Sequence, residues 1–512
     1  MTFSQTMQTG YTFSGKSFFL WMGMQDGKAD TTASISIPLS TMNRHGLIAW
    51  ATGTGKTKTI QKMIESLSNA WVPTVVMDIK WDISGLAMPG TMNDKIQSRL
   101  GQLGNPEWIP TGFPADFYTL SDVSGVRLRS TVSEFGPVLF SRLLDLGDTA
   151  ESAIALIFKY CDDNGLALLD LDDIKKVLQY IIHEGKEEIE AQYGWVSPAT
   201  VNVIMRKIIE LESQGAGWFF GEPSLDTSDF LRKDENGKWY INIIRLMDMM
   251  SKPKLFSTFM LSLLSEIYHT FPEEWDMSQP KLVLIIDEAH IIFDNATQAL
   301  LDEMEMIIKL IRSKWVGIFF CTQNPIDIPD TVLSQLGLKI QHALRAFTAK
   351  DRDAIRRASE NFPITEYYNI EDELLILGIW EALVTVLDER WIPTPLVRTM
   401  IAPPTSRMDT LTENELNWLL SVSPLILKYN THINRDSANE ILTTRISEKL
   451  QITQNTTTTF MDGVGWKITK NVSTTLAAEL GRSIGKSIGG RTGGTIGAQI
   501  FRGLLGAVFS GK

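Results

Sequence analysis

The sequence predicts an α/β fold in which helices flank a doubly wound, mostly parallel sheet. First, an apolar run at 46–51 passes through a Thr/Gly-rich turn into a helical pattern. Second, a strand-like run at 281–286 ends in two acidic residues. Third, further apolar runs alternate with helical patterns, as in parallel sheets with crossover helices. Such sheets bind ligands at the carboxyl ends of their strands, so a site is expected there.

The stretch GLIAWATGTGKTKTI at 46–60 has the strand, turn and helix that a phosphate-binding loop requires. Backbone N–H groups of such a turn and of the helix N-terminus cradle a polyphosphate such as ATP. Lys56 is expected to reach the β- and γ-phosphates, and the Thr57 hydroxyl to hold Mg²⁺. The alternative is a Thr/Gly turn with a surface lysine. The candidate nucleotide-binding residues are Thr52, Gly53, Thr54, Gly55, Lys56, Thr57 and Lys58.

The chain divides into five predicted parts. Residues 1–42 are rich in Ser, Thr and Gly, with short β-like pieces. Apolar residues recur at helical spacing through 91–240, which predicts a large insertion between two parts of the core. The parts are 1–42, a small β-rich element; 43–90, the first part of the P-loop core; 91–240, a mainly helical insertion; 241–404, the second part of the core; and 405–512, a helical C-terminal tail.

The predicted strands fall in both parts of the core. A buried strand at 73–80 follows the loop helix at βαβ spacing. After a hairpin-like run at 238–246, the core resumes with the strand at 281–286 and a helix at 296–313. The remaining strands are predicted at 315–323, 338–344, 374–378 and 381–387.

The C-terminal tail contains a glycine period and a basic end. In a helix, five interior glycines cost roughly 4–5 kcal/mol relative to alanine, so either close packing compensates or the helix does not form. The segment 466–512 is basic. It is interpreted as a self-packing helical cap, with a contact to DNA, a membrane or a neighbouring subunit as the alternative. The periodic residues are Gly481, Gly485, Gly489, Gly493 and Gly497.

The composition is that of an ordinary folded protein, with 44% hydrophobic and 21% charged residues among 512. The two cysteines are too few for a disulfide framework or a cysteine zinc site, which favours a cytoplasmic protein. Neither a signal peptide nor an apolar run of about 18 residues is evident, so a spanning helix is not expected. The net charge of −12 argues against a general nucleic-acid-coating protein, but it is compatible with a basic channel inside an oligomer.

The acidic pair after 281–286 is expected at the same sheet edge as the phosphate loop. Asp287 is placed to hold Mg²⁺, and Glu288 to orient or deprotonate the attacking water. Gln323 ends the next strand and is a candidate γ-phosphate sensor, with a turn glutamine before Asn-Pro as the alternative. His290 is interpreted as a helix-start or packing residue rather than a metal ligand.

Phosphoryl transfer also requires cationic charge on the γ-phosphate oxygens, often from a neighbouring subunit. Arg312 and Arg44 are the first candidates, and Arg345 is the third. The alternative for each of them is a surface ion pair. The six histidines do not cluster at ligand spacings, and nothing indicates a serine or cysteine hydrolase.

Five segments form one specific combination: NRHGLIAWATGTGKTKT, VVMDIKWDISGLA, LVLIIDEAHIIF, IRSKWVGIFFCTQNPIDIP and LGLKIQHALRAFTAKD. Together they resemble the bacterial HerA-like helicase C-terminal family, within the HerA/FtsK superfamily of P-loop ATPases. The resemblance covers most of the chain. It implies a RecA-like core, a homo-oligomeric hexameric ring and ATP-driven movement on double-stranded DNA, sometimes beside a nuclease partner.

The resemblance also implies roles for particular residues. Arg44 and Arg312 match arginines that act on the nucleotide, either in cis or in trans. Asp78 and Asp82 match an acidic motif after the second strand that supports the Mg²⁺ water shell. The other nucleotide roles fall on Lys56, Thr57, Asp287, Glu288 and Gln323.

The expected function is that of a Mg²⁺-dependent, ATP-hydrolysing ring motor that translocates on double-stranded DNA. An alternative is a P-loop ATPase that remodels or assembles a protein or membrane-associated complex without DNA, with the glycine-repeat tail as its anchor. The acidic net charge favours this alternative, and the resemblance favours the motor. A nucleotide-binding scaffold with little turnover is a third interpretation, if Trp50 is genuine.

Seven tryptophans stand where the family pattern has glycine. The pattern G-x-x-x-x-G-K-[ST] itself requires glycine at position 50, where this chain has Trp50. Overpacking of this kind costs typically about 1–3 kcal/mol at each position. We hypothesise that a UGA codon, read as glycine in the source organism, was translated as tryptophan; the competing interpretation is a real, degenerate ATPase. The positions are Trp50, Trp71, Trp81, Trp275, Trp315, Trp380 and Trp391.

Overall fold

The structure is a computed structural model, and it describes residues 1–51, 55–294, 298–431, 433 and 435–448. Within these residues, twelve strands form one sheet in the order β2-β1-β12-β11-β10-β3-β9-β8-β4-β7-β5-β6. The predicted α/β, RecA-like fold class is confirmed. The strands are β1 (Ser17–Gln25), β2 (Lys28–Pro38), β3 (Gly46–Ala49), β4 (Thr74–Asp78), β5 (Ala115–Thr119), β6 (Val126–Arg127), β7 (Ile241–Arg245), β8 (Leu282–Ile286), β9 (Val316–Thr322), β10 (Leu338–Gln341), β11 (Glu381–Thr385) and β12 (Val397–Ile401).

The central strands are parallel and buried on both faces. β3 pairs with β10 and β9, and β8 pairs with β9 and β4, all in parallel. The register aligns Ile48 with Cys321 and Ile285 with Phe319, and all four side chains are fully buried. Burial on both faces explains why these strands are continuous apolar runs rather than alternating ones. The segments that follow them therefore meet at one edge of the sheet.

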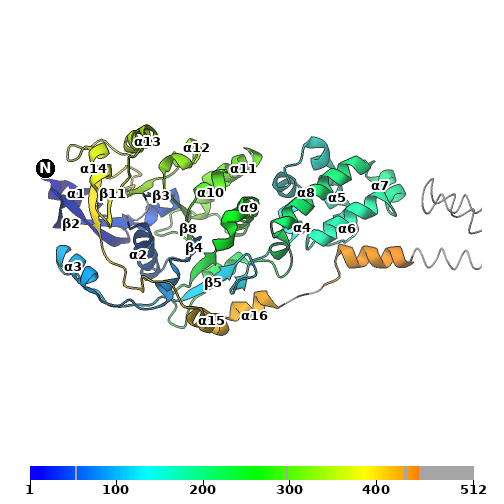
Figure 1. Cartoon of the computed structure of the whole chain (residues 1–512), viewed down its shortest axis with the longest axis horizontal. Helices are drawn as coiled ribbons and strands as arrows, with labels where there is room; N and C mark the ends of the chain where they lie inside the picture. Colours follow the sequence, from blue (N-terminus) through cyan, green and yellow to red (C-terminus); the bar gives the residue numbers. More distant parts are fainter. Residues whose placement is uncertain (52–54, 295–297, 432, 434, 449–512) are drawn as a thin grey trace, which may run out of the picture. The chain divides into compact units, whose positions relative to one another are not determined.

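The helices are distributed along the whole described chain. Helix α9 contacts both α10 and α11, and the three helices can be followed in Figure 1. The α-helices are α1 (Phe3–Tyr11), α2 (Lys56–Asn69), α3 (Asp94–Gln102), α4 (Val132–Leu143), α5 (Asp148–Asp163), α6 (Leu171–Ile182), α7 (Lys186–Gln192), α8 (Pro198–Ser213), α9 (Pro253–Thr270), α10 (His290–Asp294), α11 (Gln298–Leu310), α12 (Asp330–Leu333), α13 (Ala349–Glu360), α14 (Ile370–Ile376), α15 (Glu413–Val422) and α16 (Pro424–Asn430).

Helix α2 connects the phosphate loop to the core. Its N-cap, Gly55, has a φ of 106°, a conformation that glycine adopts without a steric penalty. The buried Ile60 and Ile64 of α2 lie in the same hydrophobic cluster as Ile48 of β3 and Ile285 of β8. The start of the helix is therefore fixed to the two strands that carry the loop and the acidic pair.

A strap of residues 405–409 runs along α2. The buried Glu65 accepts hydrogen bonds from the backbone N–H and the hydroxyl of Ser406, at 2.8 and 2.6 Å. Gln61 and Lys58, one and two turns closer to the phosphate loop, also donate to the strap. Three successive turns of α2 are thus tied to the same extended segment.

The N-terminal hairpin and the predicted insertion both add strands to the central sheet. β1 pairs antiparallel with β2 and with β12, so the N-terminal hairpin extends one side of the sheet. The helical patterns predicted between 91 and 240 form α4, α5, α6 and α8, but β5 and β6 also fall in that range. Met1–Glu440 forms one compact unit, and a second unit begins at Ile441. The five-part division stays a prediction.

Two predicted elements differ from the structure. The run at 374–378, predicted as a strand, lies mostly in helix α14, because its buried residues Leu374 and Leu377 are three apart, as on a helix face. The hairpin-like run at 238–246 instead forms β7, which pairs in parallel with β4 and β5. The start of the run does form a small hairpin, since Trp239 pairs antiparallel with Lys233, whereas the strand that follows joins the parallel part of the sheet.

Some predictions fall on residues outside the described ranges. These are the loop residues Thr52, Gly53 and Thr54 and the glycine-period, basic end of the tail. The run QNTTTT at 454–459, whose composition is typical of a linker, also lies outside them. Within the described residues, the structure contains no helix that is long and apolar enough to cross a membrane.

Candidate active site

Adjacent strands bring the main predicted residues together. Lys56 opens α2 after β3, Gln323 follows β9, and Asp287 and Glu288 follow β8. β9 lies between β3 and β8 in the sheet, and all three strands are parallel. The four side chains therefore converge at one sheet edge, as the sequence predicts.

Lys56 is buried and paired with both acids. Its Nζ lies 2.5 Å from Asp287 Oδ1 and 3.7 Å from Glu288 Oε1. Burial lowers the pKa of Lys56, but the charges of Asp287 and Glu288 outweigh burial and hold the pKa above its ordinary value. A charged ammonium at this point is suited to bind a phosphate in place of the carboxylates. The indole of Trp50 lies over the same ammonium, with 4.1 Å between Nζ and the ring centroid.

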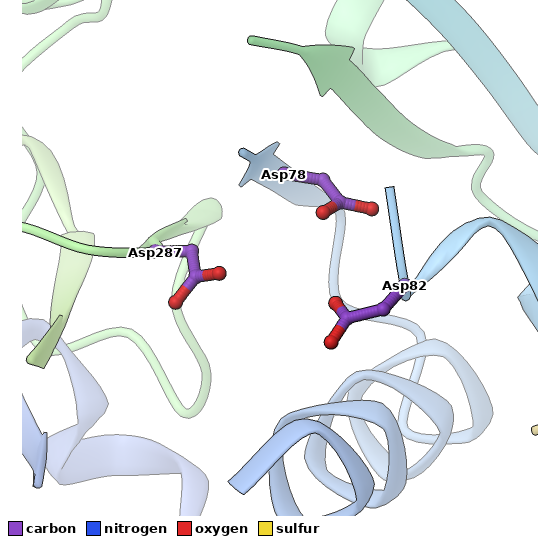
Figure 2. Close-up of side chains that lie close together, drawn as sticks. All are labelled: Asp78, Asp82 and Asp287. Carbon is purple, nitrogen blue, oxygen red and sulfur yellow. The ribbon is translucent and has the colours of Figure 1, made fainter. Parts of the chain in front are cut away.

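Three aspartates form an acidic cluster beside α2, shown in Figure 2. One carboxylate oxygen from each of Asp78, Asp82 and Asp287 lies within 4.8 Å of the others. Thr57 Oγ1 donates a hydrogen bond to Asp82 Oδ2 at 2.7 Å. The buried Asp82 Oδ1 and Asp287 Oδ2 have no hydrogen-bond partner among the described residues. Mg²⁺ prefers such carboxylate and hydroxyl oxygens, so the donor set of Thr57, Asp82 and Asp287 fits this ion.

Asp78 shapes the loop that carries Asp82. Its carboxylate accepts hydrogen bonds from the backbone N–H groups of Lys80 at 3.1 Å, Trp81 at 2.7 Å and Ile83 at 3.1 Å. Burial raises the pKa of Asp78 to about 7; the charge of Asp82 adds to this rise, and the N–H groups oppose it. Because both oxygens of Asp78 are engaged, Asp82 and Asp287 are better placed as direct metal ligands.

Glu288 is held by side chains from the neighbouring strand ends. Lys80 donates a hydrogen bond to Oε1, and Gln323 Nε2 lies 3.3 Å from Oε2. Burial raises the pKa of Glu288, but Lys56 and Lys80 together lower the pKa by more than burial raises it. The pKa of Glu288 therefore lies below its ordinary value. Glu288 is thus ionised at neutral pH and can accept a proton from water. Its φ of 47° is a strained conformation of the kind found at functional sites.

Lys80 is a functional candidate that the sequence prediction missed. It lies 208 positions before its partner Glu288, so no local pattern joins the two. The available signal was its position, two residues after the acidic end of β4, at the sheet edge that carries the other site residues.

Two predicted residues lie near this edge without joining the cluster. Lys58 Nζ donates to the carbonyl of Met408 at 2.5 Å and to Gln61 Oε1 at 3.2 Å, so its ammonium is directed to the strap. Arg345 follows β10 at the carboxyl edge of the sheet and is exposed. Neither forms a hydrogen bond or ion pair with Lys56 in the described part of the chain.

Arg44 and Arg312 lie at the opposite edge of the sheet. Arg44 precedes β3 and Arg312 precedes β9, so both lie at the amino ends of strands whose carboxyl ends lead to Lys56 and Gln323. β3 has 4 residues and β9 has 7. At about 3.3 Å per residue, these strands separate the two edges by roughly 13–23 Å. The structure therefore does not bring the two arginines together with the phosphate-loop cluster.

The two arginines share a cavity of about 560 Å³ that Lys339, Trp391 and Glu360 also line. The guanidinium of Arg44 lies over the Trp391 ring, 4.0 Å from its centroid. Burial lowers the pKa of Arg44, and the nearby charge of Arg312 lowers it further. Because cations outnumber carboxylates among the lining residues, the cavity is suited to an anion.

Comparisons with known proteins identify the family of the chain. The family model described as "Helicase HerA-like C-terminal" matches residues 24–512. Among solved structures, VirB4 of Thermoanaerobacter pseudethanolicus aligns with 15% identity over 76% of this chain and 97% of its own, with a TM-score of 0.47. The unbound bacterial conjugative coupling protein TrwBΔN70 aligns with 12% identity over 80% of this chain and 95% of its own, with a TM-score of 0.48.

The plasmid coupling protein TrwB in complex with ADP and Mg²⁺ aligns with 13% identity over 79% of this chain and 98% of its own, with a TM-score of 0.48. No curated protein sequence matches the chain. The family model covers nearly the whole chain and includes every site residue named above. The chain therefore belongs to the HerA-like helicase C-terminal family of P-loop ATPases.

Proposed function

We propose that the protein is a Mg²⁺-dependent, ATP-hydrolysing ring motor that translocates on double-stranded DNA. The observation that carries the proposal is the convergence of Lys56, Asp287, Glu288 and Gln323 at one sheet edge, within hydrogen-bonding and ion-pair distances. Membership of the HerA-like family supports ATP hydrolysis as the reaction.

Each residue of the cluster has a distinct task in this proposal. Lys56 exchanges its two carboxylate partners for phosphate oxygens of ATP and neutralises their charge. Mg²⁺, when bound by Thr57 and Asp287 together with Asp82, supplies a Lewis acid for the phosphate oxygens. The ionised Glu288 orients the attacking water and accepts its proton. Gln323, hydrogen-bonded to Glu288, links that carboxylate to the loop after β9.

The position of the two arginines supports a ring. Arg44 and Arg312 cannot reach the phosphate loop of their own chain, because the length of the sheet lies between them. Their cationic cavity is therefore assigned to the nucleotide of a neighbouring copy, where it stabilises charge on the γ-phosphate in trans. A closed homo-oligomer, hexameric in this proposal, gives every nucleotide such a neighbour.

The second candidate function is remodelling or assembly of a protein or membrane-associated complex without DNA. The net charge of −12 favours it, because a DNA motor must concentrate its positive charge in a channel.

ATP hydrolysis by the natively produced protein separates the two candidates. For a DNA motor, duplex DNA increases the rate, and the increase falls steeply between about 50 and 200 mM salt as phosphate contacts are screened. Glu288→Gln serves as the control for contaminating ATPases. A rate that responds to lipid vesicles or protein but not to duplex DNA at low salt contradicts the DNA motor.

A further inference from the structure

Tryptophan is concentrated among the residues of this protein with left-handed backbone. Eleven described non-glycine residues have a positive φ, between 47° and 66°. Four are Asp or Asn, whose short polar side chains tolerate this conformation. Five are tryptophans, in which Cβ is crowded against the backbone and no local hydrogen bond compensates. The five are Trp71, Trp81, Trp315, Trp380 and Trp391.

The remaining tryptophans provide an internal comparison. The chain has 14, and seven of them stand at the positions where the resemblance described above implies glycine. Five of those seven have a positive φ, and none of the six other described tryptophans does. The left-handed conformation therefore follows the positions that the family pattern singled out, although φ played no part in choosing them. The six comparison residues are Trp21, Trp108, Trp195, Trp218, Trp239 and Trp418.

The local structure at these positions is that of glycine. Trp71 directly follows the C-cap of α2, where a left-handed residue ends many helices and is usually glycine. Trp315 takes the same conformation in the turn that leads into β9. Trp81 lies in the turn that Asp78 holds through backbone N–H groups. Each position requires a turn conformation that glycine adopts without strain.

Three of the seven side chains gain little burial from being tryptophan. Trp275 is 89% exposed, Trp71 48% and Trp391 44%, so much of their apolar surface remains in water. Three of the seven contact the proposed catalytic machinery. Trp50 covers the Lys56 ammonium, Trp391 covers the Arg44 guanidinium, and Trp380 fills the space where a Cβ on Gly55 would point.

We infer that the native protein carries glycine at all seven positions, and that its gene specifies them with UGA, which the source cell reads as glycine. The inference concerns the identity of the residues and does not depend on the proposed function. It gives the phosphate loop the glycine that its pattern requires at position 50, and it removes the aromatic rings from Lys56 and Arg44.

Peptide mass spectrometry of the natively produced protein, together with the gene sequence, tests the inference directly. Glycine is expected in the peptides that cover the seven positions, encoded by UGA. Tryptophan is expected at the control positions Trp21 and Trp418, encoded by UGG. Tryptophan in the seven peptides, or UGG at these codons, overturns the inference.

Thermal unfolding of the chain with all seven tryptophans gives an independent test. Trp71→Gly and Trp391→Gly, at two left-handed positions whose side chains are 48% and 44% exposed, are each expected to raise the Tm. Alanine at the same two positions keeps the crowded Cβ, so it gives a smaller rise than glycine. Trp218→Gly, at a position with ordinary backbone, is the matched control and is expected to lower the Tm. Equal effects of glycine and alanine at Trp71 and Trp391 contradict the backbone argument.

A second inference rests on the ion pairs that Glu288 forms with Lys80 and Lys56. Lys80 donates to Glu288 Oε1, the oxygen that Lys56 approaches to 3.7 Å. The side chain of Lys80 is 44% exposed, whereas Glu288 is 2% exposed. Lys80 is thus the member of this ion-pair group that a large polyanion in solvent can reach. Its backbone position is set by the hydrogen bond from its N–H to Asp78.

We propose that Lys80 is a positioning residue that restrains Glu288 until a polyanion, here the backbone of duplex DNA, draws its ammonium away. An oxygen that already accepts a hydrogen bond from an ammonium is a poorer acceptor for the proton of water. Release of Lys80 therefore frees Glu288 Oε1 for the attacking water. This proposal rests on the proposed function, because it assigns the polyanion to DNA.

Steady-state ATP hydrolysis by Lys80→Met and Lys80→Arg variants tests this role. Lys80→Met is expected to raise the basal kcat several-fold with little change in KM, and to reduce the ratio of DNA-stimulated to basal rate towards one. Lys80→Arg keeps the hydrogen bond and is expected to retain the stimulation. A merely structural role lowers kcat in Lys80→Met and leaves the ratio unchanged, which overturns the proposal. Absence of DNA stimulation in the unmodified protein contradicts the proposed function. The basal kcat of Lys80→Met still tests whether Lys80 restrains Glu288.

Discussion

Acidification from pH 7 to pH 5 is expected to destabilise the protein through one buried histidine. His45 is fully buried between α11 and β9. Its Nε2–H donates to the carbonyl of Ile308 at 2.8 Å, and its Nδ1 accepts from the N–H of Ile318 at 3.0 Å. This arrangement requires a neutral ring. A proton on Nδ1 turns this acceptor into a donor, so the Nδ1–H and the backbone N–H of Ile318 point at each other and the hydrogen bond is lost.

The size of the effect follows from the pKa of His45. This pKa is lowered to about 4, mainly by burial; the charges of Arg312 and Arg44 also lower it, and the hydrogen bond to Ile308 opposes the shift. The pKa of an unfolded histidine is about 6.5. Between these two pH values the unfolded chain binds more protons than the folded one. The contribution of neutral His45 to the free energy of unfolding is therefore fully present above pH 6.5 and is lost as the pH falls towards 4. Linkage gives a loss of about 2 kcal/mol between pH 7 and pH 5.

Urea denaturation of the unmodified protein and of His45→Asn at pH 7 and pH 5 measures this effect. Asparagine is chosen because it tolerates the φ of 58° at this position. The unmodified protein is expected to lose about 2 kcal/mol more than the variant between the two pH values. His342, whose pKa burial also lowers to about 4, titrates in both proteins and cancels in the difference. Equal losses in the two proteins refute the assignment to His45.

Three further predictions concern the site. Glu288→Gln is expected to lower kcat about 10²- to 10⁴-fold with ATP affinity unchanged in equilibrium binding, because it removes only the proton acceptor; a large loss of affinity contradicts this role. Asp82→Asn is expected to raise the Mg²⁺ concentration for half-maximal hydrolysis roughly tenfold or more, and an unchanged Mg²⁺ titration contradicts its role as a ligand. Mixtures of the inactive variants Arg312→Ala and Glu288→Gln are expected to regain hydrolysis, since one interface in the mixed ring is intact; mixtures as inactive as either variant indicate that Arg312 acts within its own chain.

The cluster of Lys56, Asp287, Glu288 and Gln323 was predictable from the sequence for a simple reason. Each residue lies just after a buried apolar run, and parallel strands end at a common edge. The same logic, applied to the amino ends of the strands, gives the place of Arg312 at the other edge. The local sequence pattern is therefore enough to place a residue when the direction of its strand alone decides at which edge of the sheet the residue lies.

Pairing over long sequence distance was not predictable from local pattern. The strand at 241–245 was recognised as β-like, but its partners β4 and β5 lie more than a hundred residues earlier. Lys80 was missed because its role depends on Glu288, which its own sequence neighbourhood does not indicate. The run at 374–378 has enough β-branched and leucine character for a strand, and only burial of Leu374 and Leu377 on one face distinguishes it as helical.

The strap along α2 couples the position of the phosphate-loop helix to the segment that follows the central sheet. Glu65, Gln61 and Lys58 fasten the segment 405–409 to three successive turns of the helix whose first residue is Lys56. A shift of α2 along its axis has to break or carry along these hydrogen bonds, so Lys56 and the segment 405–409 are expected to move together.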